Sequence, residues 1–284
     1  MAQLSLSKML SMAIEYKDQS EVSDEKRGYL GYSGLNAECP RQVWYNFRFA
    51  TEPSATERRF DRIMDRGHLE EARVIKDLKR AGIEVFKVID GRELEMTGDP
   101  EEKQEEVVGF GGHVKGHPDG RVRNLPLPGY GETTMLLEIK TMSKSSFAKI
   151  KKLGVARLKE YSRSYYGQVQ AYMGRMGLKK TLYVCVNKDK EERYYDIVDF
   201  DQSEFDDLMR KEEHIVSSEA PPARAFPKGH FKCDYCQHLM VCQLGQPSRI
   251  TCRSCEHLVL KDNGVFQCGI SGKKLSLKDQ LAAC

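Results

Sequence analysis

Two acidic residues on two neighbouring predicted strands place the strongest constraint on how this chain can fold. Asp119 lies within Gly116-His117-Pro118-Asp119-Gly120, and Glu138 lies near the end of an apolar run that begins at Met135. The stretch from 124 to 134 is rich in Pro and Gly, which predicts a turn between the two strands. We therefore expect an antiparallel pair that brings the carboxylates of Asp119 and Glu138 together.

Side-chain alternation along the second strand adds a lysine to these carboxylates. Successive residues of a strand point to opposite faces, so Glu138 and Lys140 share one face and Ile139 takes the other. Magnesium commonly binds one or two carboxylates together with water and phosphate oxygens. The spacing therefore predicts a Mg²⁺ or Mn²⁺ site at which Lys140 faces the same phosphate.

A Glu-x-Lys triplet alone carries little information, because 31% of the residues are charged and such triplets arise by chance. Glu101-Glu102-Lys103 is a second example, and it lies in the hydrophilic stretch 98–106, which we expect to be a solvated loop. Glu138 differs because it lies in an apolar strand, where an unpartnered carboxylate would be costly. The interpretation of Glu138 therefore depends on the surrounding segments.

Pro118-Asp119 followed by Glu138-Ile139-Lys140 resembles the PD-(D/E)xK nuclease superfamily. Upstream, residues 66–71 (Arg-Gly-His-Leu-Glu-Glu) open a predicted amphipathic helix and are similar to the Gly-x-x-x-Glu element of RecB-like and lambda-exonuclease-like members. The resemblance implies metal ligation by Glu71, Asp119, Glu138 and the Ile139 carbonyl, with His68 and Glu70 as weaker candidates. The alternative is an acidic helix N-terminus that complements the helix dipole.

A downstream helix carries a further element of the resemblance. Gln168 and Tyr172 lie one helical turn apart on the same face, like the Gln-x-x-x-Tyr element of RecB-like nucleases. The resemblance implies that the amide and the phenol orient Lys140 or a phosphate. Alternatively, the apolar side chains of this helix simply form its buried stripe.

The resemblance as a whole implies an exonuclease that hydrolyses DNA phosphodiester bonds with Mg²⁺ or Mn²⁺, acting on linear ends or single strands. The catalytic residues that it implies are Asp119, Glu138, Lys140, Gln168 and Tyr172. Two alternatives stay open: a sequence- or structure-specific endonuclease on the same core, and a catalytically inactive protein that binds nucleic acid. The chain has no phosphate-binding Gly-x-x-x-x-Gly-Lys loop, so a helicase or recombination partner would have to unwind DNA.

Cysteine usage provides a second line of argument, since nine cysteines occur in 284 residues. The chain shows no apolar signal segment at its start and no transmembrane run, so we expect a cytoplasmic protein of a bacterium, or of a phage within its host. In that reducing compartment, clustered cysteines indicate metal sites rather than disulfides. Cys233, Cys236 and Cys242 form one close group.

The early residue Cys39, combined with this later triplet, resembles the iron–sulfur RecB-like nucleases of CRISPR adaptation, the AddB subunit type and phage relatives. The resemblance implies that Cys39, Cys233, Cys236 and Cys242 hold a structural 4Fe-4S cluster. Thiolate chemistry alone permits zinc equally well. The cluster would join the two ends of the chain around the nuclease core.

The remaining cysteines suggest a small zinc module, with Cys252, Cys255, Cys268 and Cys284 as ligands and His257 as the alternative to Cys284. Unliganded thiols are the other possibility, and Cys185, inside an apolar strand, is expected to be an ordinary buried residue. We therefore divide the chain into a nuclease core with a helical N-terminal part (1–226), a cysteine-rich cluster segment (227–248) and a zinc module (249–284).

The net charge of +3 is too small to indicate nucleic-acid binding, but its distribution is informative. Basic residues follow the Glu138 strand, are interleaved with aromatics and are opposed only by Glu160, an arrangement that suits phosphates and unstacked bases. The expected DNA contacts are Lys144, Lys149, Lys151, Lys152, Arg157 and Tyr165, with Lys159 and Arg163 in the same run. A solvated helix face is the alternative, and the acidic stretch 189–213 suggests a surface away from DNA.

Periodicity predicts an α/β fold, a mixed central sheet flanked by helices as in restriction endonucleases. The expected helices span 5–16, 33–49, 61–81, the region of Gln168, and 204–216. The expected strands span 84–89, 109–115, 119–123, 135–141, 181–186 and 193–200, with the last two forming a hairpin.

Overall fold

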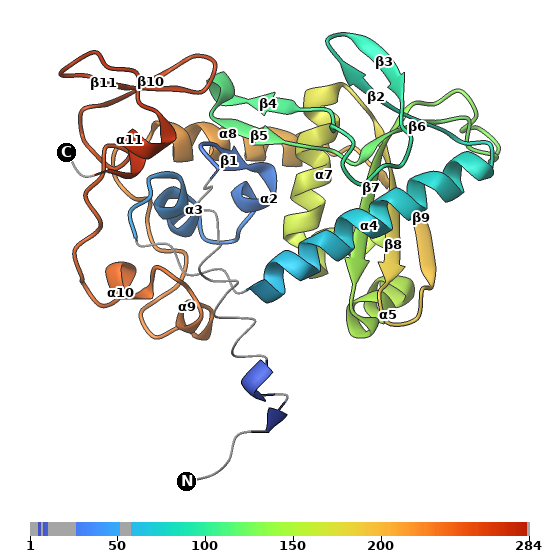
Figure 1. Ribbon diagram of the computed structural model, residues 1–284, viewed down its shortest axis with the longest axis horizontal. Helices are drawn as coiled ribbons and strands as arrows, with labels where there is room; N and C mark the ends of the chain where they lie inside the picture. The colour runs from blue at the N-terminus through green and yellow to red at the C-terminus, as the bar shows by residue number, and fades with distance from the viewer. Residues whose placement is uncertain (1–4, 7, 11–26, 52–57, 283–284) are drawn as a thin grey trace.

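The computed structural model describes residues 5–6, 8–10, 27–51 and 58–282 (Figure 1). Most of the helix expected over 5–16 lies outside these residues, and so does the expected zinc ligand Cys284. Within the described part, no helix is long and apolar enough to cross a membrane.

A six-stranded mixed sheet forms the centre of the molecule, in the order β3-β2-β6-β7-β8-β9. Only β7 and β8 run parallel, and every other neighbouring pair is antiparallel. The expected mixed α/β architecture is therefore confirmed. The strands are β2 (Glu84–Ile89), β3 (Arg92–Glu95), β6 (Gly120–Arg123), β7 (Met135–Met142), β8 (Lys180–Asn187) and β9 (Arg193–Asp199).

The connections follow the expected turns, with one strand that the sequence analysis missed. β6 pairs antiparallel with β7, with Gly120 opposite Leu137, as the Pro- and Gly-rich stretch predicted. The parallel pair β7–β8 requires a crossover, which is made by α5 (Lys144–Leu153), the 3-10 turn η2 (Val155–Arg157), α6 (Leu158–Tyr161) and α7 (Arg163–Met176). β3 was not expected, because its four residues are all exposed and carry no hydrophobic alternation.

Each face of the sheet buries its own apolar cluster, because β7 alternates between them. Met135, Leu137 and Ile139 pack with Val74, Ile75 and Leu78 of α4 (Arg58–Arg80). Leu136 faces the other cluster, to which α7 contributes Val169, Ala171, Tyr172 and Met173. Figure 1 shows α4 crossing the sheet diagonally and α7 standing beside it. Glu138 and Lys140 follow Leu136 on its face, so they point towards the α7 layer.

A second, three-stranded sheet corrects the strand expected over 109–115. The segment divides into β4 (Val107–Gly109) and β5 (Val114–Gly116), which pair antiparallel across the 3-10 turn η1 (Phe110–Gly112). Gly111 and Gly112 have positive φ angles of 58° and 88°, which reverse the chain here. β1 (Leu30–Gly31) completes this sheet by pairing parallel with β5.

The single helix expected over 33–49 is also corrected, because the structure has two. α2 (Tyr32–Leu35) ends at Asn36, and α3 (Pro40–Phe47) begins at a proline. The residue before a proline is driven out of the helical region, and Cys39 is accordingly extended, with φ −98° and ψ 108°. The break leaves Cys39 at the start of α3.

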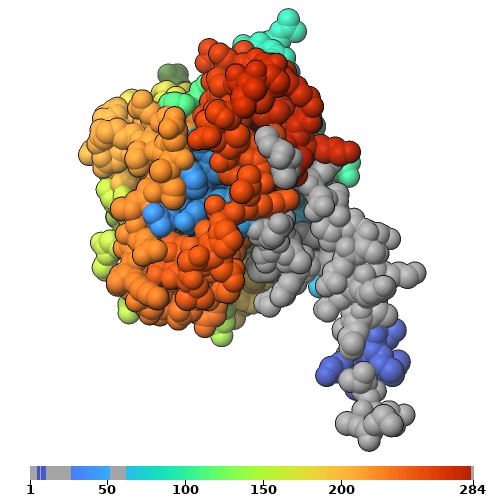
Figure 2. Space-filling model, turned by 90° about the vertical axis from the view of Figure 1, so that its left-hand side faces the viewer, coloured from blue at the N-terminus to red at the C-terminus, as the bar shows by residue number. Residues whose placement is uncertain are grey.

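The C-terminal part returns to cover the N-terminal residues. After α8 (Gln202–Ser217) come α9 (Phe231–Asp234), α10 (Leu239–Cys242), the hairpin of β10 (Leu258–Lys261) and β11 (Val265–Cys268), and α11 (Leu277–Leu281). Figure 2 shows these orange and red segments lying over the blue N-terminal region. Phe266 and Leu275 join the same apolar cluster as Tyr32 and Phe47, so the last segment packs into the main core.

The guanidinium of Arg253 links this C-terminal segment to the N-terminal region through hydrogen bonds. Its side chain is buried and donates hydrogen bonds to the carbonyls of Phe47 at 2.7 Å and Gly28 at 3.0 Å, and to Gln280 Oε1 at 2.6 Å. The guanidinium carbon also lies 3.7 Å from the centroid of the Phe266 ring. Burial holds the pKa of Arg253 well below its usual value, and Arg48 acts in the same direction.

Candidate active site

The β6–β7 pair brings the two predicted carboxylates side by side. Asp119 Oδ2 accepts a hydrogen bond from the Ile139 amide at 2.7 Å, which places it next to Glu138. Lys140 Nζ lies 2.5 Å from Glu138 Oε1, so the alternation expected for this strand is confirmed. Asp119 and Glu138 are both buried, and Lys140 reaches them from the same face.

Two glycines of the Asp119 segment are required by close packing. A methyl group on Gly116 would lie 2.5 Å from both Cε1 and Oη of Tyr172, so the absence of a side chain lets that ring enter the site. Gly120 has a φ of 141°, and a methyl group there would lie 2.7 Å from Met96 Sδ. The two glycines therefore allow Asp119 and Tyr172 to lie close together.

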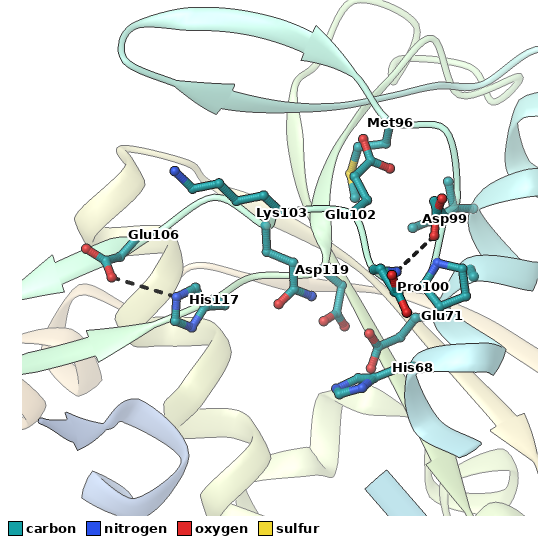
Figure 3. Close-up of a pocket in the computed structure, with 14 residues that line it drawn as sticks. His68, Glu71, Met96, Asp99, Pro100, Glu102, Lys103, Glu106, His117 and Asp119 are labelled. Carbon is teal, nitrogen blue, oxygen red and sulfur yellow. Dashed lines mark hydrogen bonds and ion pairs between the residues drawn. The ribbon is translucent and has the colours of Figure 1, made fainter. Parts of the chain in front are cut away.

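Helix α4 supplies the third carboxylate. His68, Glu71 and Asp119 line one cavity of about 440 Å³. In Figure 3 the carboxylates of Glu71 and Asp119 point into the same space. Glu70 does not line this cavity, since it is buried and pairs with Arg73 Nη1 at 2.7 Å. Of the acidic candidates on this helix, Glu71 therefore has the position that a metal ligand requires.

These charges perturb one another strongly. Burial raises the pKa of Asp119 well above its ordinary value, and the negative charges of Glu138 and Glu71 raise it further. Burial also raises the pKa of Glu71, although His68 and Lys140 oppose this shift. Burial alone would lower the pKa of Lys140, but Glu138 and Asp119 outweigh it and raise that pKa. One ammonium thus faces three carboxylates, and a divalent cation would relieve the remaining repulsion.

The donor set fits a hard divalent cation. Both carboxylate oxygens of Glu138 are buried; Oε1 pairs with Lys140, and Oε2 has no hydrogen-bond partner among the described residues. Such an orphaned acceptor is costly unless a ligand meets it. No three His, Cys, Asp or Glu side chains of the described part stand close enough to form a complete cage. Magnesium needs no such cage, since water and phosphate oxygens complete its shell.

Helix α7 places the predicted amide and phenol next to this group. Gln168 Nε2 donates to Tyr172 Oη at 3.3 Å, and both side chains are buried. Burial and the charge of Glu138 raise the pKa of the Tyr172 phenol, which keeps it protonated. The Tyr165 ring lies 5.4 Å from Lys140 Nζ, measured to the ring centroid. Tyr165 was expected to contact DNA, and in the structure it borders the site lysine.

The second wall of the cavity was not foreseen from the sequence. It consists of the loop 99–104 together with Glu106 and His117, and Figure 3 shows Glu106 and His117 across the cavity from Glu71. The solvated character expected for this stretch is only partly correct. Glu102 is largely buried and pairs with Lys87 at 2.7 Å, because the loop folds back against β2. The sequence contained a signal for His117, since it lies one residue beyond β5 and two residues after Lys115.

The basic run after β7 divides into two parts. Lys144, Lys149, Lys151 and Lys152 are exposed on α5, and none of them lines the cavity. Lys159 and Arg163 instead pair with the buried Glu204 of α8, at 2.8 and 3.2 Å, while Arg157 pairs with Glu160 at 2.6 Å. Part of the acidic stretch 189–213 therefore lies against the basic run, which corrects the expectation that the two are separate. DNA contact by α5 stays a prediction.

The four cysteines of the expected iron–sulfur site lie around one cavity of about 40 Å³. Cys39 reaches it from the start of α3, and Cys233, Cys236 and Cys242 reach it from α9, α10 and the turn between them. Gln243 Nε2 donates to Cys233 Sγ at 3.4 Å. Burial raises the pKa of the Cys236 thiol, although the His238 amide donates to it. Tyr45 lines the same cavity.

Cys252, Cys255 and Cys268 line a second, smaller cavity together with His257. The side chain and amide of Ser271 and the amide of Ile270 donate to Cys268 and lower its pKa, and the His257 amide donates to Cys255 Sγ at 3.4 Å. Amide donors of this kind stabilise a thiolate. Cys185 is buried in β8 as expected, and burial raises its pKa to about 12.

No family model matches this chain, and no curated protein is significantly similar to it. Solved structures that resemble it include SSO0001, at 17% identity and a TM-score of 0.40, covering 85% of this chain and 98% of that one. The alkaline exonuclease LHK-Exo from Laribacter hongkongensis is 16% identical with a TM-score of 0.43, and its complex with dAMP is 15% identical with a TM-score of 0.42. Both LHK-Exo structures cover 67% of this chain and are covered over 87% of their own. Similarity at this level is too weak to assign an activity.

Proposed function

We propose that this protein is a metal-dependent nuclease that hydrolyses phosphodiester bonds in DNA. One observation carries the proposal: Asp119 and Glu71 line one cavity, and Asp119, held by the Ile139 amide, lies beside the buried Glu138–Lys140 ion pair. A divalent cation would relieve the repulsion among these buried carboxylates, and the same ion would neutralise charge on a phosphodiester during hydrolysis.

Each side chain has a distinct part in the proposed reaction. Asp119, Glu138, the Ile139 carbonyl and Glu71 would hold one or two Mg²⁺ or Mn²⁺ ions, with His68 at the edge of the set. A bound ion of this kind lowers the pKa of water and neutralises charge on the phosphate. Lys140 is a fixed donor for a phosphate oxygen or the attacking water. Tyr172 and Gln168 hold that lysine in place from α7.

A nuclease assay with matched variants tests this proposal. End-labelled linear DNA is incubated with Mg²⁺, with Mn²⁺, or with a chelator, and cleavage is expected only with the metals. Glu138→Gln and Lys140→Gln should each lower the rate by about 10²-fold or more. Lys180→Gln, which changes a half-buried lysine of β8 that does not line the cavity, is the control and should cleave like the parent. Parental rates in either site variant would refute the mechanism.

Action from ends is the more specific part of the proposal, and it rests on the resemblance to RecB-like exonucleases. Linear duplex, linear single strands and covalently closed circles are compared under one condition. Degradation of the linear substrates alone supports an exonuclease, whereas cleavage of circles identifies an endonuclease on the same core. Variants of the exposed α5 lysines, such as Lys151→Gln with Lys152→Gln, test whether that helix contacts the strand. A requirement for a helicase partner would appear as inactivity on duplex ends alone.

We further propose that Cys39, Cys233, Cys236 and Cys242 hold a 4Fe-4S cluster. The four thiols line one cavity and thiolates are the ligands of iron–sulfur clusters, but among the described residues they do not stand at ligand spacing, so a cluster would have to draw them together. The cluster would join α3 to α9 and α10, so its role would be structural. Protein purified without oxygen should be brown and contain iron. Colourless protein that contains only zinc would reject the cluster.

A zinc ion at Cys252, Cys255 and Cys268 is the corresponding proposal for the last segment. These three thiols share a cavity with His257, so either His257 or Cys284 would complete the tetrahedral set. Zinc content is measured for the parent, for Cys284→Ser and for His257→Asn. The variant that loses zinc identifies the fourth ligand, and a parent without zinc contradicts the site.

A further inference from the structure

Lys115 and His117 place two nitrogen groups beside the carboxylates of Asp119 and Glu71. They alternate along β5 and beyond it, so both side chains leave the sheet on the same side. His117 lines the same cavity as Asp119 and Glu71. The Tyr29 ring contacts both residues, with its centroid 5.8 Å from Lys115 Nζ and 6.4 Å from the His117 ring. The aromatic side chain thus keeps the two nitrogen groups together.

The carboxylate of Glu106 lies against both of these nitrogen groups. Both of its oxygens accept hydrogen bonds from Lys115 Nζ, at 2.9 and 3.1 Å, and Oε2 lies 3.8 Å from His117 Nε2. Figure 3 shows Glu106 and His117 together across the cavity from Glu71. An anion with two oxygens on one lysine has the geometry that a phosphate would adopt there.

Glu106 differs from the neighbouring acidic residues of its loop. Glu102 binds Lys87 and the amide of Thr97, and Glu105 binds Arg121 and the amide of Val88. Both therefore hold the loop against the sheet. The Glu106 side chain, as far as the described residues show, accepts hydrogen bonds only from Lys115 and otherwise lies near His117, and 40% of it is exposed. Exposed ion pairs of this kind contribute little to stability, so a competing anion can displace Glu106.

We infer that Lys115 and His117 form a second phosphate subsite, for the strand phosphate next to the one that reacts, and that Glu106 fills this subsite in the free protein. The inference rests on the proposed nuclease function and adds to it a means of setting substrate affinity. The incoming phosphate takes over the hydrogen bonds of Lys115, and Glu106 turns into solvent. Glu106 thus competes with the DNA phosphate for Lys115 and lowers the affinity for DNA.

Equilibrium binding of a labelled single-stranded oligonucleotide tests this inference. Fluorescence anisotropy is recorded with Ca²⁺ in place of Mg²⁺ over a series of salt concentrations, and gels check that the strand stays intact. The variants are Glu106→Gln, Lys115→Gln and the double variant. The control is Asp207→Asn, which removes one negative charge from the exposed Asp207–Arg210 pair on α8, away from the cavity.

Glu106→Gln is expected to bind more tightly, because Lys115 then meets a phosphate without losing a partner. One added phosphate contact raises the salt slope by about 0.7 and tightens binding about fivefold at 0.1 M salt. Both gains should vanish in the double variant, and Asp207→Asn should bind like the parent. In cleavage assays, Glu106→Gln should lower KM.

The outcomes separate this inference from the proposed function. If the parent binds DNA but Glu106→Gln binds no more tightly than Asp207→Asn, the subsite is wrong and the nuclease proposal is untouched. A gain that persists in the double variant also overturns the subsite, because Lys115 would then play no part. If neither the parent nor any variant binds or cleaves DNA, the proposed function fails, and the subsite fails with it.

Discussion

Replacing Gly116 with alanine gives the sharpest test of how the site is assembled. The added methyl group would lie 2.5 Å from Cε1 and Oη of Tyr172, more than 1 Å inside the usual carbon contact distance of about 3.5–4.0 Å. The Tyr172 ring cannot simply swing away, because it is 2% exposed and meets the Tyr32 ring edge-on, with centroids 5.7 Å apart. Either the ring or strand β5 must therefore move.

Overpacking of this kind costs about 1–3 kcal/mol. For a chain of this size, that corresponds to a fall in Tm of about 2–12 °C. If Tyr172 orients Lys140 as proposed, its displacement should also slow cleavage, and a penalty of about 1.4 kcal/mol lowers the rate tenfold. Urea unfolding and thermal melting measure the loss of stability, and cleavage of end-labelled DNA measures the loss of rate.

Two controls isolate the contact between Gly116 and Tyr172. Gly131→Ala adds the same methyl group where no heavy atom lies within 4 Å and φ is not positive, so stability should change by less than about 0.5 kcal/mol. In a Tyr172→Ala background, Gly116→Ala should cost almost nothing, because the obstructing ring is gone. Equal losses from Gly116→Ala in both backgrounds would falsify the reasoning, and so would parental stability in the single variant.

Three further predictions follow from buried charges and thiols. Burial and neighbouring carboxylates raise the pKa of Asp119 in the folded protein. In metal-free protein, Asp119 therefore contributes its full stabilisation below the unfolded pKa of about 4, and this stabilisation is lost as pH rises through the higher folded pKa. Asp119→Asn should therefore raise the metal-free Tm at pH 8 by about 2–4 °C while abolishing cleavage, and an unchanged or lower Tm contradicts this. Arg253→Ala should lower the free energy of unfolding, measured in urea, by about 3–5 kcal/mol, because it leaves a cavity and unpaired carbonyls at Phe47 and Gly28. A loss below about 1 kcal/mol would show that other contacts hold the C-terminal segment. Cys233→Ala should abolish bound iron while Cys185→Ala retains it, and equal iron content in the two variants argues against the proposed cluster.

The sequence by itself determined the features that are encoded locally. Alternation along 135–142 put Glu138 and Lys140 on one face, and the Pro- and Gly-rich turn set the antiparallel pairing with Asp119. The helical period placed Gln168 one turn before Tyr172, and the structure confirms their contact. These relations depend on strand and helix geometry over a few residues, so they can be read without knowing what packs against them.

Only the tertiary structure decided which partners these residues meet. Gly116 was only one residue of the Asp119 segment in the sequence, and in the structure its missing side chain leaves room for the Tyr172 ring from a helix much later in the chain. Glu204 looked like part of a separate acidic surface, but it neutralises Lys159 and Arg163. Glu106 was one charge in a hydrophilic loop until strand pairing set it against Lys115. The physical reason is that packing and ion pairing depend on contacts between distant segments, whereas hydrophobic period and turn chemistry are properties of each segment alone.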